Sequence, residues 1–445
     1  MATGVDAGGQ TRKHATQIFQ AALASADAHA AVFRNLAFDG ASLTIGKVSA
    51  PLASHARVVV IGAGKASARM GLAVEEMLGS RINGGLISVK DGHGVSTRFI
   101  QVREAGHPLP DARSLANGRA ILQSLNGLTA HDVVLCLISG GGSALMEVLA
   151  DGLTLSNVRA VTDTVMRAGA DISDLNCVRK HLSLLKGGQL ARAAQPAAIF
   201  SLILSDVVGN DLSAIASGPT CPDPTTFADA LQVISRCDHG GIPAMKPVIG
   251  HLERGARGEL SETPKPDEPF WNNVRNLIIG SNEIAIEAAA REARALGYTT
   301  EIATLAMQGE AREVGRTLAE LACRRRAEGA HQLCLLAGGE TTVTVRGLGI
   351  GGRNQELTLA SALALDGTND VTLLSAATDG GDGSSDAAGA VVNGATIRRG
   401  SSIGLDAQVM LEQNDSHHFF RALGDQVITG PTLTNVNDVV MILIE

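Results

Sequence analysis

The amino-acid sequence predicts an α/β protein of two domains, and three observations lead to this fold class. Short apolar runs alternate with amphipathic helical stretches along the chain, which is typical of mainly parallel sheets covered by helices. Several of these runs end in glycine-rich turns that open the next helix. The segment 240–276 contains five of the 13 prolines and divides the chain into two halves.

Eight apolar runs predict buried strands. They cover residues 58–61, 86–89, 133–138, 200–204, 277–279, 333–336, 371–375 and 439–444. Helices are predicted between them where a capping residue precedes an amphipathic stretch. Asp111, Asp223 and Ser281 are the expected caps of helices that end near residues 125, 235 and 296.

The proline-rich segment is the expected domain boundary, because prolines fix an extended backbone and prevent a helix from joining the halves. We therefore predict an N-terminal Rossmann-like α/β domain over residues 1–250 and a smaller C-terminal α/β domain over residues 272–445. As an alternative, the last strand, about 430–445, packs back on the first domain. A cleft between the two domains is expected.

The composition excludes several classes of protein. Glycine accounts for 51 of 445 residues, about 11% against about 7% in an average protein, but no G-X-Y repeat of collagen is present. The chain has nine Phe, one Tyr and one Trp, and a formal net charge of -8. Binding of nucleic acid relies on aromatic stacking platforms or on a basic surface, so a nucleic acid partner is not expected.

Cysteine usage and the lack of long apolar runs indicate a cytoplasmic protein. The six cysteines form no C-x-x-C pair, and some lie within apolar runs, which suits buried free thiols in a reducing compartment. No run approaches the roughly 18 apolar residues of a membrane span, and the N-terminal segment lacks the apolar core of a signal peptide. We expect no membrane association, and either a monomer or a homodimer.

The first glycine turn follows the strand at 58–61 and contains Gly62 and Gly64. Glycine permits a sharp turn, and the N-terminus of the following helix can bind an anion. Ser67 occupies the third glycine position of a dinucleotide-binding G-x-G-x-x-G motif, and no acidic residue ends the next strand. Lys65 instead supplies positive charge, which favours a phosphate site. An ordinary strand-to-helix turn with a solvated lysine is the alternative.

The second glycine turn follows the strand at 133–138. Three consecutive glycines allow backbone amides to approach phosphate oxygens directly. The pattern fits neither a Walker loop nor a nucleophile elbow, and a close strand-to-helix contact is the structural alternative. Its residues are Ser139, Gly140, Gly141, Gly142 and Ser143.

Charged residues after these turns add candidates for a site. The segment 176–188 has the pattern of a basic helix and contains Arg179, Lys180 and Lys186, for which a solvated face is the alternative. Asp206 lies just past a buried strand, where ligands of open α/β sheets bind. It could act as a base or a magnesium ligand, or simply cap a turn.

Two segments of the second half are also candidates. Arg353 lies between glycines and a predicted helix, where it could hold a carboxylate or phosphate by two parallel hydrogen bonds. The loop 378–386 contains Asp379, Asp382 and Asp386, whose spacing does not fit an EF-hand. One or two of these carboxylates could share Mg²⁺ with phosphates, and an acidic turn is the alternative.

Together these motifs resemble the class II glycerate kinases, whose C-terminal part is called the MOFRL domain. The motifs occur in the family's order over nearly the whole chain, although Asn210, Gly381 and Leu433 are atypical at their positions. They are IGAGKA (61–66), GHPLPD (106–111), SGGGSAL (139–145), NCVRKHLSLLKGGQLA (176–191), LSDVVGNDLSAIASGPT (204–220), GGETTV (338–343), GIGGRNQE (349–356), TDGGDG (378–383) and TNVND (434–438).

The resemblance implies a Rossmann-like N-terminal domain, a MOFRL-type C-terminal domain and an interdomain cleft. It further implies Mg²⁺-assisted transfer of the γ-phosphate of ATP to D-glycerate, giving 2-phosphoglycerate. Lys65, Arg353 and Asp206 are the implied catalytic residues, and Asp206, Asp379 and Asp382 the metal-side groups. The implied substrate- and phosphate-binding residues are Gly62, Gly64, Ser139, Gly140, Gly141, Gly142, Ser143, Arg179, Lys180, Lys186, Glu340 and Asn354.

Two other functions stay open as alternatives. The first is an NAD(P)-dependent hydroxypyruvate reductase, against which Ser67 and the missing ribose-binding acid argue. The second is a non-catalytic, two-lobed metabolite-binding protein, which has less need of a cationic pair together with several acids. Phosphoryl transfer relies on positioning and charge neutralisation, so the residues themselves favour a kinase.

Overall fold

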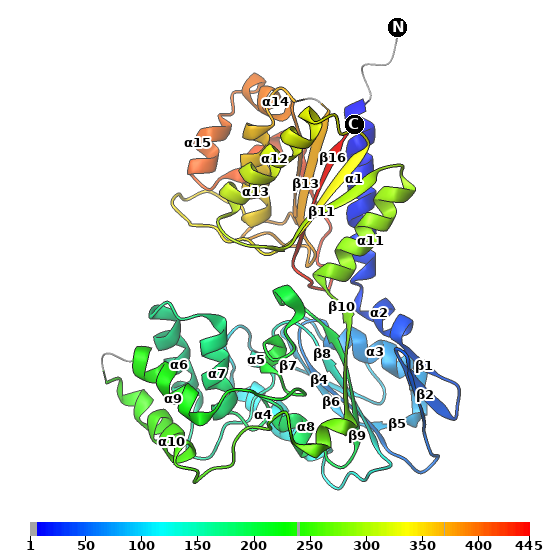
Figure 1. The fold of residues 1–445 in the computed structure, drawn as a ribbon, viewed down its shortest axis with the longest axis vertical. Helices are drawn as coiled ribbons and strands as arrows, with labels where there is room; N and C mark the ends of the chain where they lie inside the picture. Colours follow the sequence, from blue (N-terminus) through cyan, green and yellow to red (C-terminus); the bar gives the residue numbers. More distant parts are fainter. Residues whose placement is uncertain (1–6, 238–240, 369) are drawn as a thin grey trace. The chain divides into compact units, whose positions relative to one another are not determined.

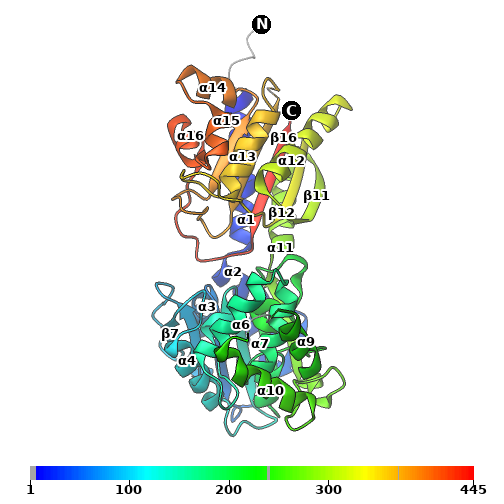
Figure 2. The same cartoon turned by 90° about the vertical axis from the view of Figure 1, so that its left-hand side faces the viewer.

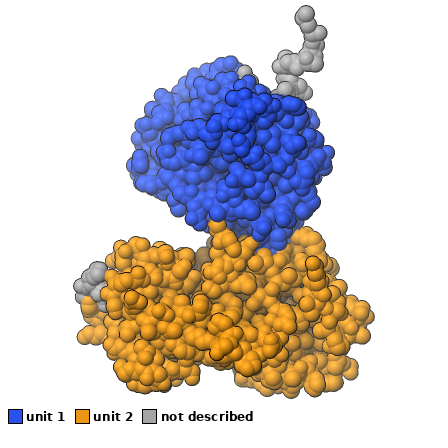
Figure 3. All heavy atoms as spheres, in the orientation of Figure 1, with its two compact units in different colours: residues 1–27, 280–445 blue, residues 28–279 orange. Residues whose placement is uncertain are grey.

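The structure is a computed structural model of the chain. It consists of two compact units, which are coloured separately in Figure 3. One unit comprises residues 28–279, and the other combines the N-terminal helix with residues 280–445. The residues that the structure describes are 7–237, 241–368 and 370–445.

The N-terminal helix α1 (Ala7–Ser25) belongs to the C-terminal unit. The sequence had predicted that this segment is part of the first domain, residues 1–250. The helix packs along α11 (Asn282–Ala295) and also contacts β13 (Val371–Ala377) and β16 (Asp438–Ile444), as Figure 1 shows. An amphipathic pattern indicates that a helix buries one face, but it does not identify the surface that covers this face.

The unit of residues 28–279 is built around a seven-stranded sheet in the order β10-β9-β8-β4-β6-β7, with β5 beside β4. The strand pairs from β9 to β7 are parallel, and so is the pair of β4 with β5. The strands are β4 (Val58–Ala63), β5 (Ile82–Gly84), β6 (Leu86–Lys90), β7 (Gln101–Ala105), β8 (Val133–Ile138), β9 (Ala198–Leu204) and β10 (Val274–Gly280).

The order of these strands reverses between β4 and β8. From β4 the chain proceeds through α3 (Ser67–Leu78) to β6 and β7 on one side. It then returns through α4 (Ala112–Ser124) to β8 and β9 on the other side. Ligands of doubly wound sheets bind outside the carboxyl ends of the strands at such a reversal. The fold therefore places both glycine turns, at the ends of β4 and β8, at its expected binding edge.

The remaining elements of this unit flank the sheet. Four helices pack around a separate apolar core (Figure 2). They are α6 (Leu155–Arg167), α7 (Ile172–Leu182), α9 (Phe227–Cys237) and α10 (Lys246–Ala256). A small antiparallel sheet contains β1 (Leu36–Phe38), β2 (Ser42–Ile45) and β3 (Val48–Pro51). The other helical segments are α2 (Ala28–Asn35), α5 (Gly142–Leu145), α8 (Gln189–Ala193), η1 (Gly79–Arg81), η2 (Val208–Asn210), η3 (Ile215–Ser217), η4 (Pro243–Met245) and η5 (Pro269–Asn273).

The C-terminal unit contains a six-stranded sheet in the order β11-β12-β16-β13-β14-β15. Only β11 with β12 is parallel among these pairs, so the expectation of mainly parallel sheets is wrong for this unit. The last strand, β16, is fully buried between β12 and β13 of its own unit. The strands not yet given are β11 (Thr299–Met307), β12 (Leu333–Gly339), β14 (Gly389–Asn393) and β15 (Gln426–Val427).

Helices cover both faces of this second sheet. On one face lie α1 and α11, and on the other α12 and α13 pack closely together over an apolar core (Figure 1). The helices on this second side are α12 (Ala311–Ala327), α13 (Arg353–Ala364), α14 (Thr396–Ser402), α15 (Ala407–Glu412) and α16 (Ser416–Leu423). The predicted α/β fold class is thus confirmed.

All eight predicted strands are present, and two of the three predicted caps are confirmed. Asp111 accepts hydrogen bonds from the first turn of α4, and Ser281 accepts one from the backbone N–H of Ile284 in α11. Asp223 is not the cap of α9, because it is fully buried and accepts hydrogen bonds from the hydroxyls of Thr225 and Thr263. The additional strands β7 and β11 are half-exposed, so continuous apolar runs could not reveal them.

Two further expectations concern the cysteines and the membrane. All six cysteines are free thiols, in agreement with the absence of paired spacing in the sequence. Among the described residues, no helix has the length and apolar character needed to span a bilayer.

Adjacent glycines beside β4 provide a matched test of backbone packing. Gly84 and Gly85 both have φ of +129°, but a Cβ on Gly85 would lie 1.9 Å from the carbonyl oxygen of Val60, whereas one on Gly84 would meet nothing within 4 Å. Gly84→Ala should cost about 1–3 kcal/mol of unfolding free energy through backbone strain alone. Gly85→Ala should cost several kcal/mol more, because β4 must move. Urea unfolding measures both, and equal losses would contradict this packing argument.

Candidate functional site

The two glycine turns, recognised separately in the sequence, form one structure. Strands β4 and β8 are in parallel register, with Ala63 opposite Ile138. The backbone N–H of Ser139 donates to the carbonyl of Ala63 at 3.1 Å, and that of Lys65 donates to the carbonyl of Gly140 at 2.9 Å. The turns therefore leave the sheet side by side, at the strand reversal.

The hydroxyl of Ser139 holds the start of α3. It accepts a hydrogen bond from the backbone N–H of Ala66 at 3.0 Å and exchanges one with the hydroxyl of Ser67 at 2.9 Å. A Cβ on Gly64 would lie 2.1 Å from this hydroxyl, and Gly64 has φ of +143°. Ser139 is 2% exposed. Gly64, Ser67 and Ser139 are therefore linked by packing, which explains why a serine follows the first turn where a dinucleotide site has a glycine.

The backbone amides of the two turns differ in availability. In the first turn, the N–H of Gly64 donates to the carbonyl of Ser88, and the next two amides are bonded to the second turn. Gly62 packs against the carbonyl of Leu137. In the second turn, the amides of Gly140 and Gly141 donate to no other group in the described part of the chain. The second turn is thus the better cradle for phosphate oxygens.

Three polar side chains converge on the triglycine turn, residues 140–142. A Cβ on Gly140 would lie 2.1 Å from Oδ2 of Asp206. A Cβ on Gly141, which has φ of +84°, would lie 2.9 Å from Nε2 of His107 and 3.7 Å from Cε of Lys65. Glycine is required here because side chains would occupy the space of these groups. Lys65, His107 and Asp206 are each half-buried.

His107 was not among the predicted site residues, although it belongs to the GHPLPD motif. Burial and the nearby charges of Lys65, Lys90 and His93 lower the pKa of His107 to about 4. Its imidazole is therefore neutral near pH 7. The sequence could have indicated this residue, because the histidine lies between glycine and proline in a recognised motif. It does not show, however, that the histidine contacts the triglycine turn.

A small cavity of about 140 Å³ opens beside Gly141 and His107. Arg179, Lys186 and Ser143 also line it. The ammonium of Lys186, 1% exposed, pairs with the carboxylate of Glu147. Burial lowers the pKa of Lys186 and that of Arg179. The hydroxyl of Ser143 shares a hydrogen bond of 2.8 Å with that of Ser217.

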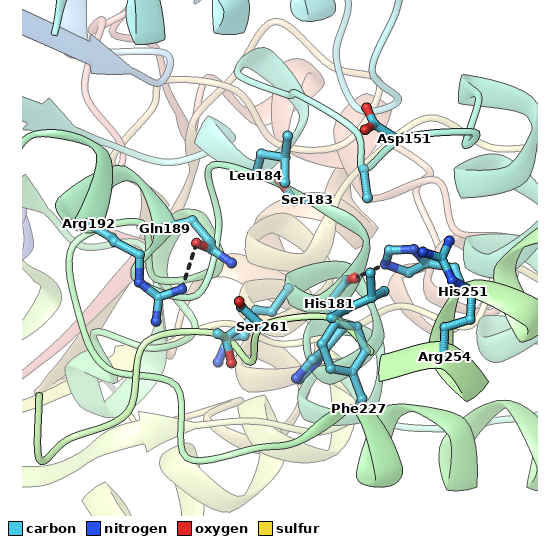
Figure 4. Close-up of a pocket in the computed structure, with 14 residues that line it drawn as sticks. Asp151, His181, Ser183, Leu184, Gln189, Arg192, Phe227, His251, Arg254 and Ser261 are labelled. Carbon is cyan, nitrogen blue, oxygen red and sulfur yellow. Dashed lines mark hydrogen bonds between the residues drawn. The ribbon is translucent and has the colours of Figure 1, made fainter. Parts of the chain in front are cut away.

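A larger cavity of about 330 Å³ lies among the helices α7 to α10, and Figure 4 shows the residues around it. Its cationic side chains are already paired. Lys180 lies 3.4 Å from Asp223, Arg192 lies 2.7 Å from Glu268, and Arg254 lies 3.4 Å from Glu259. The basic segment of the sequence is thus divided between the two cavities: Arg179 and Lys186 line the smaller one, and Lys180 lines the larger one.

In the C-terminal unit, Arg353 begins α13 and is bound by two carboxylates. Its Nε and Nη2 donate to the carboxylate oxygens of Asp438 at 2.6 and 3.0 Å, and its Nη1 donates to Glu340. Burial opposes the charge of Arg353, but Asp438 and Glu340 raise its pKa above the usual value. Burial raises the pKa of Asp438 to about 6 despite this arginine. Glu340 and Arg353, both predicted site residues, are therefore direct partners.

Asp382 holds the first turn of α13, the helix that begins with Arg353. Its two carboxylate oxygens accept hydrogen bonds from the backbone N–H groups of Asn354 at 2.9 Å and Gln355 at 2.8 Å, in the first turn of α13. The side-chain amides of both residues also donate to it. The carbonyl oxygen of the Asn354 side chain accepts from Ser375 at 2.6 Å. Asp382 and Asn354 therefore position the helix that carries Arg353.

The predicted metal-side residues lie in two units. Asp206 belongs to the unit of residues 28–279, and Asp379 and Asp382 to the other. Asp379 is half-buried, and its Oδ1 accepts the backbone N–H of Gly381 at 3.0 Å. No cluster of three or more His, Cys, Asp or Glu side chains suited to a metal ion occurs in the described ranges.

Comparisons with known proteins cover nearly the whole chain. Residues 14–249 match a family described as a domain of unknown function (DUF4147), and residues 333–438 match the MOFRL family. A glycerate 2-kinase from Pyrococcus horikoshii is 41% identical over 87% of this chain and 87% of its own. A relative from Agrobacterium vitis that carries a hydroxypyruvate reductase name is 42% identical over 96% of this chain and 93% of its own. The crystal structure of glycerate kinase from Thermotoga maritima superposes with a TM-score of 0.88 and 37% identity, covering 98% of this chain and 100% of that one.

The support of α13 by Asp382 can be tested by substitution. Asp382→Ala removes the acceptor for four buried donors, so the free energy of unfolding should fall by about 2–4 kcal/mol. Asp406→Ala is the matched control, because Asp406 caps the exposed helix α15 through one hydrogen bond to the backbone N–H of Val409 and should cost about 1 kcal/mol. Thermal or urea unfolding measures both. A loss at Asp382 no larger than that at Asp406 would disprove the assigned role.

Proposed function

The chain belongs to the glycerate kinase family that carries a C-terminal MOFRL domain, and from this premise we propose that it phosphorylates D-glycerate to 2-phosphoglycerate with ATP. The convergence of Lys65, Asp206 and two available amides on the triglycine turn carries the proposal. A turn of this kind, at the strand reversal of a doubly wound sheet, suits a phosphate group. The neighbouring cation and carboxylate suit transfer of that group to a hydroxyl.

Each of these groups has a separate task in the proposed reaction. The amides of Gly140 and Gly141 bind phosphate oxygens of the donor. The ammonium of Lys65 offsets the negative charge that is shared among the oxygens of the transferring phosphoryl group. The carboxylate of Asp206 accepts the proton that the glycerate hydroxyl loses as it attacks phosphorus. Little covalent chemistry is needed beyond this positioning.

Arg353 is proposed as the second cation that acts on the phosphoryl group. A guanidinium keeps its charge at all accessible pH values and can bind two oxygens at once. Asp438 and Glu340 hold it in one orientation, and Asp382 fixes the helix from which it projects. The two proposed cations, Lys65 and Arg353, belong to different units of the chain.

Of the three carboxylates predicted to bind Mg²⁺, two are suited to this role and one is not. Mg²⁺ in kinases is commonly held by one or two carboxylates together with phosphate oxygens and water. Asp206 and the half-buried Asp379 suit this role. Asp382 does not fit, because both of its oxygens accept hydrogen bonds from α13. The ion, when bound, would neutralise charge on the phosphate oxygens.

The hydroxypyruvate reductase alternative has weaker support. A dinucleotide fold presents the free amides of its first glycine turn to a pyrophosphate. In this chain, the amides of residues 64–66 donate hydrogen bonds to Ser88 of β6 and to Gly140 and Ser139 of the second turn. Ser67, in the place of the third glycine, belongs to the same network. These bonds favour a structural role for the first turn.

A direct assay tests the proposed reaction. The protein is supplied with D-glycerate, ATP and Mg²⁺, and 2-phosphoglycerate is detected through enolase without added mutase. Lys65→Ala and Arg353→Ala should each lower kcat by about 100-fold or more, since each removes charge stabilisation of the transition state. Lys47→Ala and Arg326→Ala alter exposed cations and should leave kcat nearly unchanged. Absence of product, with consumption of NADH in the presence of hydroxypyruvate, would refute the kinase assignment.

A further inference from the structure

The small cavity beside the triglycine turn has the size of an acceptor rather than of a nucleotide. Its volume is about 140 Å³, close to the cavity of about 150 Å³ that holds one benzene molecule. A three-carbon hydroxycarboxylate is of similar size, whereas ATP is several times larger. The cavity is lined by Gly141, Ser143, His107 and Arg179, so it adjoins the groups proposed to handle the phosphoryl group.

Arg179 brings to this cavity a positive charge that forms no ion pair with a described residue. The guanidinium is partly buried, and its one hydrogen bond to a described residue is a 3.3 Å contact with the hydroxyl of Thr162. Within the described ranges, no carboxylate lies within ion-pair distance of it. Lys186, the other cation of the cavity, is paired with Glu147. Glu147 also lines the cavity and its charge favours the charged form of Arg179, but this carboxylate is bonded to Lys186 and makes no ion pair with Arg179. A bound carboxylate would give the partly buried guanidinium a direct partner through two hydrogen bonds.

His107 gives the cavity a neutral hydrogen-bonding group. Its imidazole contacts Gly141 on the side where Cε of Lys65 also lies. Neither ring nitrogen of His107 has a hydrogen-bond partner among the residues that the structure describes. A neutral imidazole can both donate to and accept from a hydroxyl. It therefore adds a hydroxyl-binding group next to the cation, without a second charge.

The larger cavity of Figure 4 provides a useful contrast. It has more than twice the volume of the small one, but Lys180, Arg192 and Arg254 are each paired with a carboxylate. A negatively charged ligand there would have to compete with those carboxylates. Arg179, which forms no ion pair with a described residue, therefore favours the smaller cavity for an anion.

We propose that the small cavity is the acceptor subsite, in which Arg179 binds the carboxylate of a short hydroxycarboxylate and His107 hydrogen-bonds one of its hydroxyls. This inference rests on the proposed kinase function. With the carboxylate held at Arg179, the hydroxyl-bearing carbons lie toward Gly141, where Lys65 and Asp206 act on the phosphoryl group. The cavity then selects acceptors by charge and by length.

Steady-state kinetics of the full chain tests the subsite. Arg179→Met should raise KM for D-glycerate by about 10- to 100-fold, the range expected for a lost charge-assisted hydrogen bond, with KM for ATP changed less than about two-fold. His107→Leu should raise KM for D-glycerate about three- to ten-fold, and His107→Gln should restore part of it because an amide also bonds to hydroxyls. Arg254→Met, which alters a paired cation of the larger cavity, should leave both values unchanged.

A second measurement separates binding from misfolding. Calorimetric titration of D-glycerate into each variant should show weaker binding for Arg179→Met, while its thermal unfolding midpoint stays near that of the unmodified chain. An increase in KM for ATP alone would place a donor phosphate at Arg179 and overturn the inference, as would an unchanged KM for D-glycerate. Failure of the unmodified chain to form 2-phosphoglycerate would instead refute the kinase proposal.

Discussion

The close approach of β4 and β8 at their carboxyl ends is the constraint on which the candidate site depends. Gly64 accommodates the hydroxyl of Ser139, and Gly140 accommodates the carboxylate of Asp206. Gly141 leaves room for His107 and Lys65. A side chain at any of these glycines would displace a group that the site uses. Part of the glycine excess in the sequence is therefore explained by close contacts between the backbone and side chains of the candidate site, and not by flexibility alone.

The second constraint is how each cation is neutralised. Lys186 and Lys180 are buried with carboxylate partners, and such pairs hold the fold in one arrangement without offering free charge to a ligand. Arg353 is also paired, but it is partly exposed at the start of a helix. Arg179 alone of these four has no acidic partner among the described residues. Ion pairing, which the positions in the sequence do not reveal, distinguishes the cations that are neutralised within the fold from Arg179, which forms no ion pair with a described residue.

The C-terminal unit shows how a surface arginine can be held rigidly. Arg353 donates hydrogen bonds from all three of its guanidinium nitrogens, and the buried Asp382 anchors the helix that begins with it. Asp438 belongs to β16, which lies in the centre of its sheet. The orientation of this arginine therefore depends on the core of the unit, so that substitutions distant from the site can still affect it.

The sequence by itself determined the α/β class, the eight buried strands and the two glycine turns, because these depend on local periodicity and on the conformational freedom of glycine. It also singled out Lys65, Arg353 and Asp206 as candidates for the site. Only the tertiary structure decided that the basic segment is divided between two cavities, that Asp382 caps a helix and that His107 contacts the triglycine turn. Contacts between distant segments decide these roles, since burial and charge pairing depend on which residues the fold brings together.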